Sequence, residues 1–300
     1  MVRRTLGLNT LDTFGILRIP KAELIKLTEL SANGSLLEDL RLPAITDLTG
    51  LEHATQLKTL RLSANNVNDI TPLTQLTQLI QIDLWRNQIS DITPLAGLTE
   101  LRELDLAGGP TGNEIVDISP LAGLTELREL NLSSIGISDI SPLAGLMELR
   151  ELNLGFNRVT DISPLTQLIE LTMLELHANQ ISDITPLAQL TELRELSLSN
   201  NEIVDISPLA QFKKLTLLYF SYNQVRDITP LAQAESLTKL YLGHNQIRDL
   251  SPLTTLTRLT TLDLASNQIS DVTPLAHFLN RWRTWTFEII ESKMLPLSQT

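Results

Sequence analysis

The chain has 300 residues, of which 42% are hydrophobic, and it carries a formal net charge of −12 at pH 7. It contains no cysteine, which excludes disulfides, thiolate metal sites and cysteine nucleophiles. No run approaches the roughly 18 apolar residues that a membrane helix needs, and no basic stripe of the kind that binds nucleic acid is present. Asn9, Asp12 and Arg18 interrupt the apolar core that a signal peptide would need. We therefore predict a cytoplasmic chain, or an extracellular one if the chain is a fragment of a larger protein.

The first 36 residues contain a segment with the features of a short amphipathic helix. Pro20 would lie in its first turn, and Asn33-Gly34 would end it. Three leucines follow the proline at helical spacing: Leu24, Leu27 and Leu30. We predict that residues 1–36 form an N-terminal helical cap over the open core of the repeats that follow.

Residues 37–280 consist of one repeated unit. The pattern L-x-x-L-x-L-x-x-N-x-[IV]-x-D-[ILV]-[ST]-P-L-x-x-L occurs ten times, with a usual period of 22 residues, as in Leu149 to Glu170. A fixed period of this size indicates a solenoid. The first coil, Leu37 to Gln56, is degenerate, so we predict eleven coils. The coil that begins at Leu101 has four extra residues within Ala107–Gly112, which would lie on the binding side or be a tolerated surface insertion.

Each part of the repeat predicts a local structure. Inward and outward residues alternate around the second and third leucines, which is the period of a strand with one buried face. Stacked coils would then form a parallel sheet. The asparagine would hydrogen-bond exposed backbone in a ladder that runs from coil to coil. Serine or threonine before proline would be the N-cap of one short helical turn on the opposite face.

One aspartate per coil accounts for most of the net negative charge. The column holds eleven of the 35 acidic residues, and the other 24 nearly balance the 23 basic ones. Carboxylates spaced by about 4.8 Å repel one another, so we expect each to accept backbone N–H groups at the start of its turn. A row of cation sites is the alternative, although the clustered ligands of a calcium loop are missing. The column consists of Asp47, Asp69, Asp91, Asp117, Asp139, Asp161, Asp183, Asp205, Asp227, Asp249 and Asp271.

The last 20 residues contain an aromatic version of the strand pattern. Trp282, Trp285 and Phe287 keep the spacing of the first three leucines of the repeat. A terminal repeat must differ from the others if it is to end a solenoid. We predict that residues 281–300 form a capping strand and a tail.

The motifs L-x-x-L-x-L, N-x-I and D-I-x-P-L recur from Leu57 to roughly Phe278, and they resemble those of the bacterial internalins, a family of leucine-rich repeat proteins. The resemblance implies an α/β fold, namely a right-handed solenoid with a parallel sheet on its concave face and short 3-10 or helical turns on its convex face. It also implies a protein-protein interaction module that binds a protein ligand on the concave sheet.

Aromatic side chains at outward strand positions are the best candidates for contact with such a ligand. All three tyrosines of the chain occupy outward positions of the two coils that begin at Leu215 and Leu237. Aromatic residues grouped on an exposed sheet are typical of interface hot spots, although tyrosine also favours strands for its own sake. This group consists of Tyr219, Tyr222, Tyr241, His244 and Leu217. A second, weaker group is Trp85 and Arg86, and Phe156, Met173 and His177 are scattered between the two groups.

The remaining polar residues favour a binding role over catalysis. Arginine columns that include Arg102 and Arg128 lie between glutamate columns, so we expect these charges largely to cancel and to leave a solvated face or a polar docking strip. No acid is placed to orient His244 beside Ser221, and an open sheet offers no water-excluding pocket. We predict a monomer that is not an enzyme and has no cofactor, metal ion, nucleic acid or membrane as partner. A regulatory or scaffold subunit of a signalling assembly and an extracellular adhesion protein of internalin type are the alternatives.

Overall fold

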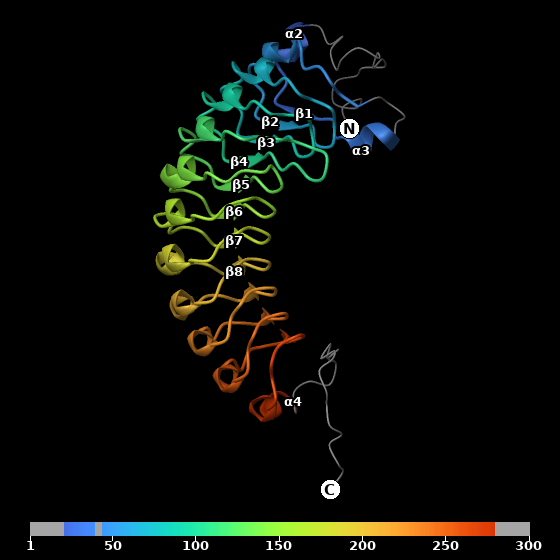
Figure 1. Cartoon of the computed structure of the whole chain (residues 1–300). Coiled ribbons are helices and arrows are strands. Elements are labelled where there is room, and N and C mark those ends of the chain that lie inside the picture. Colours follow the sequence, from blue (N-terminus) through green and yellow to red (C-terminus); the bar gives the residue numbers. More distant parts are fainter. Residues whose placement is uncertain (1–20, 40–43, 280–300) are drawn as a thin grey trace. The chain divides into compact units, whose positions relative to one another are not determined.

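The computed structural model describes residues 21–39 and 44–279 (Figure 1). The chain divides into two compact units, residues 1–159 and residues 160–300. Within each unit, every coil places one short strand on one face and one 3-10 turn on the opposite face, and we call these the sheet face and the turn face. None of the helices in the described residues is long and apolar enough to span a bilayer.

Both units are built from strands of only three residues and single 3-10 turns. The first unit contains α2 (Lys21–Leu24), β1 (Glu29–Ser31), α3 (Gly34–Asp39), β2 (Thr59–Arg61), β3 (Gln81–Asp83), β4 (Glu103–Asp105), β5 (Glu129–Asn131) and β6 (Glu151–Asn153). The second unit contains β7 (Met173–Glu175), β8 (Glu195–Ser197), β9 (Leu217–Tyr219), β10 (Lys239–Tyr241), β11 (Thr261–Asp263) and α4 (Ala276–Leu279). The 3-10 turns are Leu51–His53, Thr71–Leu73, Thr93–Leu95, Ser119–Leu121, Ser141–Gly145, Ser163–Leu165, Thr185–Gln189, Ser207–Gln211, Thr229–Gln233, Ser251–Thr255 and Thr273–Leu275.

Neighbouring strands within each unit pair in chain order, parallel and without a shift in register. In the first unit Leu60 lies opposite Ile82, and in the second Leu218 lies opposite Leu240. The inter-coil hydrogen bonds continue beyond the three-residue strands, since the Tyr222 N–H donates to the next coil's carbonyl at 2.9 Å. Equivalent residues of successive coils therefore lie in columns across the sheet face.

The leucine and isoleucine positions of the repeat form the core of each unit. In the coil of β3, Leu79, Ile82 and Ile89 are at most 1% exposed. Phe212 in the coil of β8 and Phe220 in the coil of β9 occupy leucine positions and are fully buried. Because each coil buries its apolar residues against its neighbours, the outward side chains are the ones left to contact other molecules.

The asparagine column forms the predicted hydrogen-bond ladder. Asn87 Oδ1 accepts a hydrogen bond from the Val67 N–H at 3.0 Å, and Asn87 Nδ2 donates to the carbonyls of Leu62 and Leu84, both at 3.0 Å. Each asparagine thus joins its own turn to the preceding coil, and the prediction is confirmed. The same arrangement recurs at Asn65, Asn113, Asn201, Asn223, Asn245 and Asn267.

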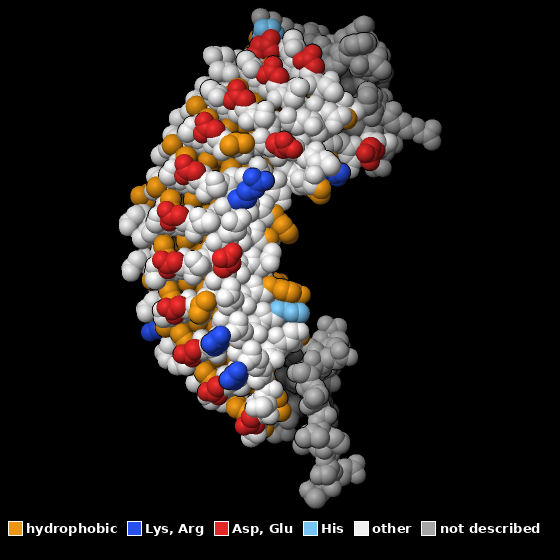
Figure 2. Space-filling view, in the orientation of Figure 1, with side chains coloured by type: hydrophobic (Ala, Val, Ile, Leu, Met, Phe, Trp, Pro, Cys, Tyr) orange, Lys and Arg blue, Asp and Glu red, His pale blue; other side chains and the backbone are white. Residues whose placement is uncertain are grey.

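The aspartate column caps the 3-10 turns. In all eleven coils, aspartate Oδ1 accepts the backbone N–H of the serine or threonine two residues later at 2.8 Å, as we expected for these carboxylates. Acidic side chains are seen in a row along each unit in Figure 2. No group of three acidic or histidine side chains among the described residues is arranged to hold a metal ion.

The prediction that serine or threonine is the N-cap is wrong. The turn Ser163–Leu165 begins at the serine itself, and the preceding Ile162 makes no side-chain cap. Proline follows and has no N–H, so the Ser163 N–H is the first donor that needs an acceptor, and Asp161 is the residue placed to supply one. Hydrogen bonds from the backbone and hydroxyl of Ser163 lower the pKa of Asp161 from its usual value.

The helix predicted between Pro20 and Gly34 is wrong beyond Leu24. Residues 29–31 form β1, which pairs in register with β2, so that Leu30 lies opposite Leu60. Leucines three residues apart fit a helix and also the L-x-x-L start of the repeat, and pairing with β2 decides the outcome. The described residues between 37 and 56 contain no strand, because they form the turn half of the coil whose strand is β1. The capping strand predicted for residues 281–300 lies outside the described residues.

Candidate functional site

The three tyrosines and His244 lie together on the sheet face of the second unit. Tyr219 on β9 and Tyr241 on β10 are register partners. Their rings are nearly parallel, with centroids 4.7 Å apart and planes 15° apart. Tyr219 is 39% exposed. Two outward aromatic side chains at neighbouring register positions thus form one stacked pair. Stacking of this kind is a favourable arrangement for two aromatic rings.

A second stacked pair lies immediately after the same two strands. The rings of Tyr222 and His244 are 4.0 Å apart and 10° from parallel. Both residues have a left-handed backbone, with φ of 60° and 56°, and so do the equivalent residues of the other coils of this unit, such as Ala178 and Asn200. This conformation costs non-glycine residues energy and is imposed by the turn before each asparagine. We call Tyr219, Tyr222, Tyr241 and His244 the aromatic patch.

Leu217, Gly243 and Asp263 border the aromatic patch. Leu217, predicted as part of the site, begins β9 and is half-buried beside the tyrosine pair. After β10, a side chain on Gly243 would lie 2.8 Å from Asp263 Oδ2. The Asp263 carboxylate therefore lies across this glycine, and its Oδ1 accepts the Ala265 N–H at 2.9 Å.

Two carboxylates on β7 and β8, next to β9, influence the pKa of Tyr219 in the patch. Burial, the neighbouring phenol of Tyr241 and the carboxylates of Glu195 and Glu175 together raise the pKa of Tyr219. Burial is the largest cause of this shift, and the two glutamate charges add to it because a nearby negative charge disfavours a second one. These glutamates were not among the residues predicted from the sequence to form the site. Their 22-residue spacing from Ser197 and Leu217 was the signal that could have identified them.

The second predicted group, Trp85 and Arg86, lies in the first unit, and Phe156 of the same unit lies apart from it. Trp85 and Arg86 follow β3, whereas Phe156 follows β6, so two coils lie between them. Trp85 is 41% and Phe156 61% exposed. Arg86 and Phe156 have the same left-handed backbone as the patch residues, with φ of 53° and 56°. In the second unit, Met173 is half-buried on β7, and His177 Nδ1 lies 3.8 Å from Glu175.

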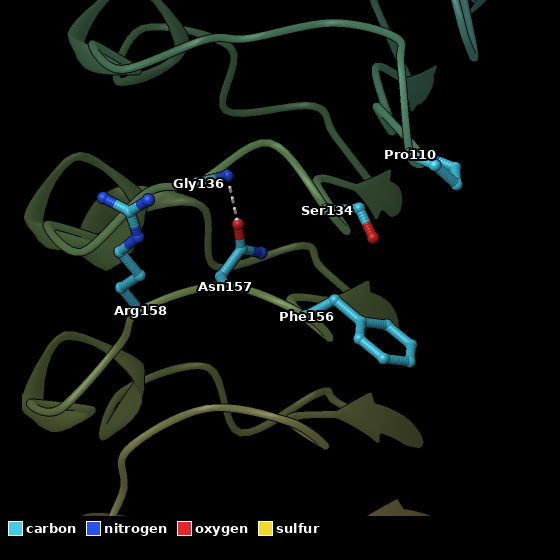
Figure 3. Close-up of a pocket in the computed structure, with 7 residues that line it drawn as sticks. Pro110, Ser134, Gly136, Phe156, Asn157 and Arg158 are labelled. Carbon is cyan, nitrogen blue, oxygen red and sulfur yellow. Dashed lines mark hydrogen bonds between the residues drawn. The ribbon is translucent and has the colours of Figure 1, made fainter.

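The inserted loop and Phe156 line an open hollow of about 570 Å³. In Figure 3, Pro110 and Phe156 project on either side of Ser134, while the Gly136 N–H donates to Asn157. The backbone of the loop folds closely on itself, since a side chain on Gly112 would overlap the Gly108 carbonyl oxygen. The four-residue insertion and the nearby Ile135, which replaces a ladder asparagine, were the sequence signals for this irregular region.

An acidic strip runs along the sheet face of the first unit. Glu103, Glu129 and Glu151 are successive register partners. Burial, followed by the charges of Glu103 and Glu151, raises the pKa of Glu129. Burial, together with the nearby Asp83 charge, raises the pKa of Asp105. The predicted cancellation by the arginine columns is therefore incomplete in this strip, because the like charges of neighbouring carboxylates are still felt.

Comparison with known proteins identifies the repeat. A family model for leucine-rich repeats, two copies per match, fits residues 55–97, 99–145, 148–189, 191–233 and 235–277. None of the curated proteins compared with the chain matches it.

Among solved structures, the internalin inlF of Listeria monocytogenes has 38% sequence identity and a TM-score of 0.80, and the match covers 86% of this chain and 72% of that one. Internalin C2 of the same species has 33% identity and a TM-score of 0.50, with coverage of 82% and 84%. A leucine-rich repeat protein of Leptospira interrogans has 26% identity and a TM-score of 0.71, with coverage of 87% and 72%. The predicted solenoid, with a parallel sheet and short 3-10 turns, is confirmed. The chain belongs to the leucine-rich repeat family and is an internalin-like member of it.

Proposed function

We propose that the chain binds a protein ligand through the aromatic patch on the sheet face of its second unit. Leucine-rich repeat proteins are in general protein-protein interaction modules. The observation that carries the more specific proposal is the pair of aromatic stacks on and immediately after β9 and β10, at positions where other coils of this unit hold residues such as Ser197, Asn200 and Ala178.

The stacks suit binding because their side chains are already ordered. Tyrosine offers a large apolar ring and a polar hydroxyl, and it is enriched among the residues that dominate binding energies. Each ring is held against its register neighbour, so little rotamer freedom remains to be lost when a ligand binds. The proposal is that one monomer uses this patch to contact one protein ligand, without nucleic acid or a membrane.

The test is the affinity for a partner captured from the source cell and then purified. Tyr219, Tyr222 and Tyr241 are replaced together with serine, and binding is measured by titration calorimetry. Truncating a hot-spot residue costs at least ~2 kcal/mol of binding free energy. The triple variant is therefore expected to bind more weakly by a factor of about a thousand or more if the effects add. Val204→Ser is the control, because Val204 is 56% exposed but lies outside the sheet face.

An unchanged affinity of the triple variant would refute the proposal and would direct attention to Trp85, Arg86 and the hollow beside Phe156. The circular dichroism spectrum and urea midpoint of the triple variant are measured alongside. Outward side chains contribute little to the core, so both are expected to stay close to those of the parent chain.

A further inference from the structure

Tyr219 has one ring face against Tyr241, and its other face is directed towards β8. The ring centroids of the two tyrosines are 4.7 Å apart, which matches the spacing of roughly 4.8 Å between neighbouring strands. Because the two rings are nearly parallel and one strand spacing apart, each ring turns its faces towards the neighbouring strands and its edges along its own strand. The free face of Tyr219 therefore points along the sheet to its register partner on β8, which is Ser197.

The side chain of Ser197 is smaller than those of its register partners on either side, which predicts a notch in the sheet face at this point. Ser197 is the small outward residue between Tyr219 on β9 and Glu175 on β7, and these three residues are register partners. Tyr219 and Glu175 are separated by two strand spacings, about 10 Å. Glu195 lies on the same face of β8, two residues before Ser197 and so about 7 Å along the strand. We call the space bounded by these four residues the Ser197 notch.

The notch is acidic. In the described part of the chain, neither Glu195 nor Glu175 makes an ion pair with lysine or arginine, and the nearest basic group to Glu175 is His177 Nδ1 at 3.8 Å. Lys239 is in the same column as Glu195 but two strands away, with Leu217 between them. Both glutamates also contribute to the raised pKa of Tyr219, so their charges reach the ring.

We propose that the Ser197 notch binds an arginine side chain of the protein ligand, with the guanidinium group stacked on Tyr219 and bonded to the Glu195 carboxylate. A guanidinium group is planar, is permanently charged and stacks on aromatic faces, and its fork of N–H donors fits one carboxylate. Ser197 leaves room for this plane, and Glu175 adds negative charge on the far side. The inference rests on the proposed function and names the chemistry of one of its contacts.

The test uses two small probes that differ in charge. N-acetyl-arginine amide and its neutral counterpart N-acetyl-citrulline amide are titrated into the full chain, and the tyrosine ring resonances are followed by NMR. The chain has only three tyrosines, so three single Tyr→Phe variants assign the signals. The arginine probe is expected to shift the Tyr219 resonance with a millimolar dissociation constant, weakened severalfold by added salt, and the citrulline probe is expected to have little effect.

Three variants locate the contact. Glu195→Gln removes the carboxylate and Ser197→Leu fills the notch, and each is expected to weaken the arginine probe at least severalfold. Glu170→Gln changes an exposed acid away from the sheet face and should leave binding unchanged. Equal shifts from both probes, or arginine binding that neither notch variant weakens, would overturn the inference. If the arginine probe fails while the tyrosine variant still loses its protein partner, the inference falls and the proposed function stands. If the tyrosine variant keeps its partner, the proposed function falls whatever the probe does.

Discussion

Replacing Asn87 with alanine measures what one rung of the asparagine ladder contributes to stability. Asn87 is fully buried, and its three shortest hydrogen bonds reach Val67, Leu62 and Leu84. The two carbonyls keep other partners after the change, because Leu62 O also accepts from Asn65 Nδ2 and Leu84 O from the asparagine of the next coil. The Val67 N–H is left without an acceptor.

The expected loss follows from these three bonds. A buried N–H left without an acceptor costs about 1–3 kcal/mol. Each of the two carbonyls keeps a hydrogen bond from another donor, so the loss of its bond to Asn87 costs only about 0.5–1 kcal/mol. Asn87→Ala should therefore lower the free energy of unfolding by about 2–5 kcal/mol. The matched control is Asn68→Ala in the preceding coil, where the side chain is exposed and the change should stay within ~0.5 kcal/mol.

The assay combines a global and a local measurement. Repeat arrays need not unfold in one step, so the urea midpoint is measured together with hydrogen exchange of the Val67 amide. The variant should show a lower midpoint and faster exchange at Val67. A midpoint like that of Asn68→Ala, with Val67 exchange unchanged, would refute the view that the ladder ties the coils together.

Three further predictions concern the caps and the inserted loop. Asp161→Ala should lower the urea midpoint more than Ser163→Ala, because the aspartate accepts the first N–H of the 3-10 turn; the reverse order would return the cap to serine. Eight aspartates of the column have a pKa below the usual 3.8, so their stabilisation is present above that pH and is lost as pH falls through the lowered values. The two sheet-face carboxyls with raised pKa act in the opposite direction but are fewer, so melting temperatures should fall below about pH 4, and a rise there would contradict the capping role. Gly112→Ala should destabilise the first unit by about 1–3 kcal/mol because its side chain would overlap backbone, whereas Gly97→Ala, with open space around it, should be nearly neutral in thermal melts.

Much of the fold could be predicted because the same residue types recur at the same spacing in every repeat. The strand, the asparagine ladder and the aspartate contacts each depend on one residue type at one position, so period alone reveals them. The start of the array could not be predicted, since Leu24, Leu27 and Leu30 fit two structures equally well. The capping residue was misassigned because Asp161 and Ser163 can both accept an N–H, and only the exact start of the turn distinguishes them.

The candidate site was predictable as a set of residues but not as a geometry. The 22-residue spacing places Tyr219 beside Tyr241 and Tyr222 beside His244. The stacking of the rings in pairs depends on side-chain rotamers and on the left-handed backbone before each asparagine. The 22-residue spacing predicts neither of these. The role of Glu195 beside the patch depends on the same orientation, because only the direction of the Tyr219 ring shows where its free face lies.

The central claim is that a protein ligand covers the aromatic patch, and hydroxyl-radical footprinting of the complex tests it most directly. The chain has only three tyrosines, and all lie in the patch, so oxidation of each one can be followed by mass spectrometry without changing the sequence. We expect Tyr219 and Tyr222, which are 39% and 55% exposed in the free chain, to become protected when the partner is bound, while Val116 and Val204 outside the sheet face keep their reactivity. Unprotected tyrosines in a saturated complex would contradict it.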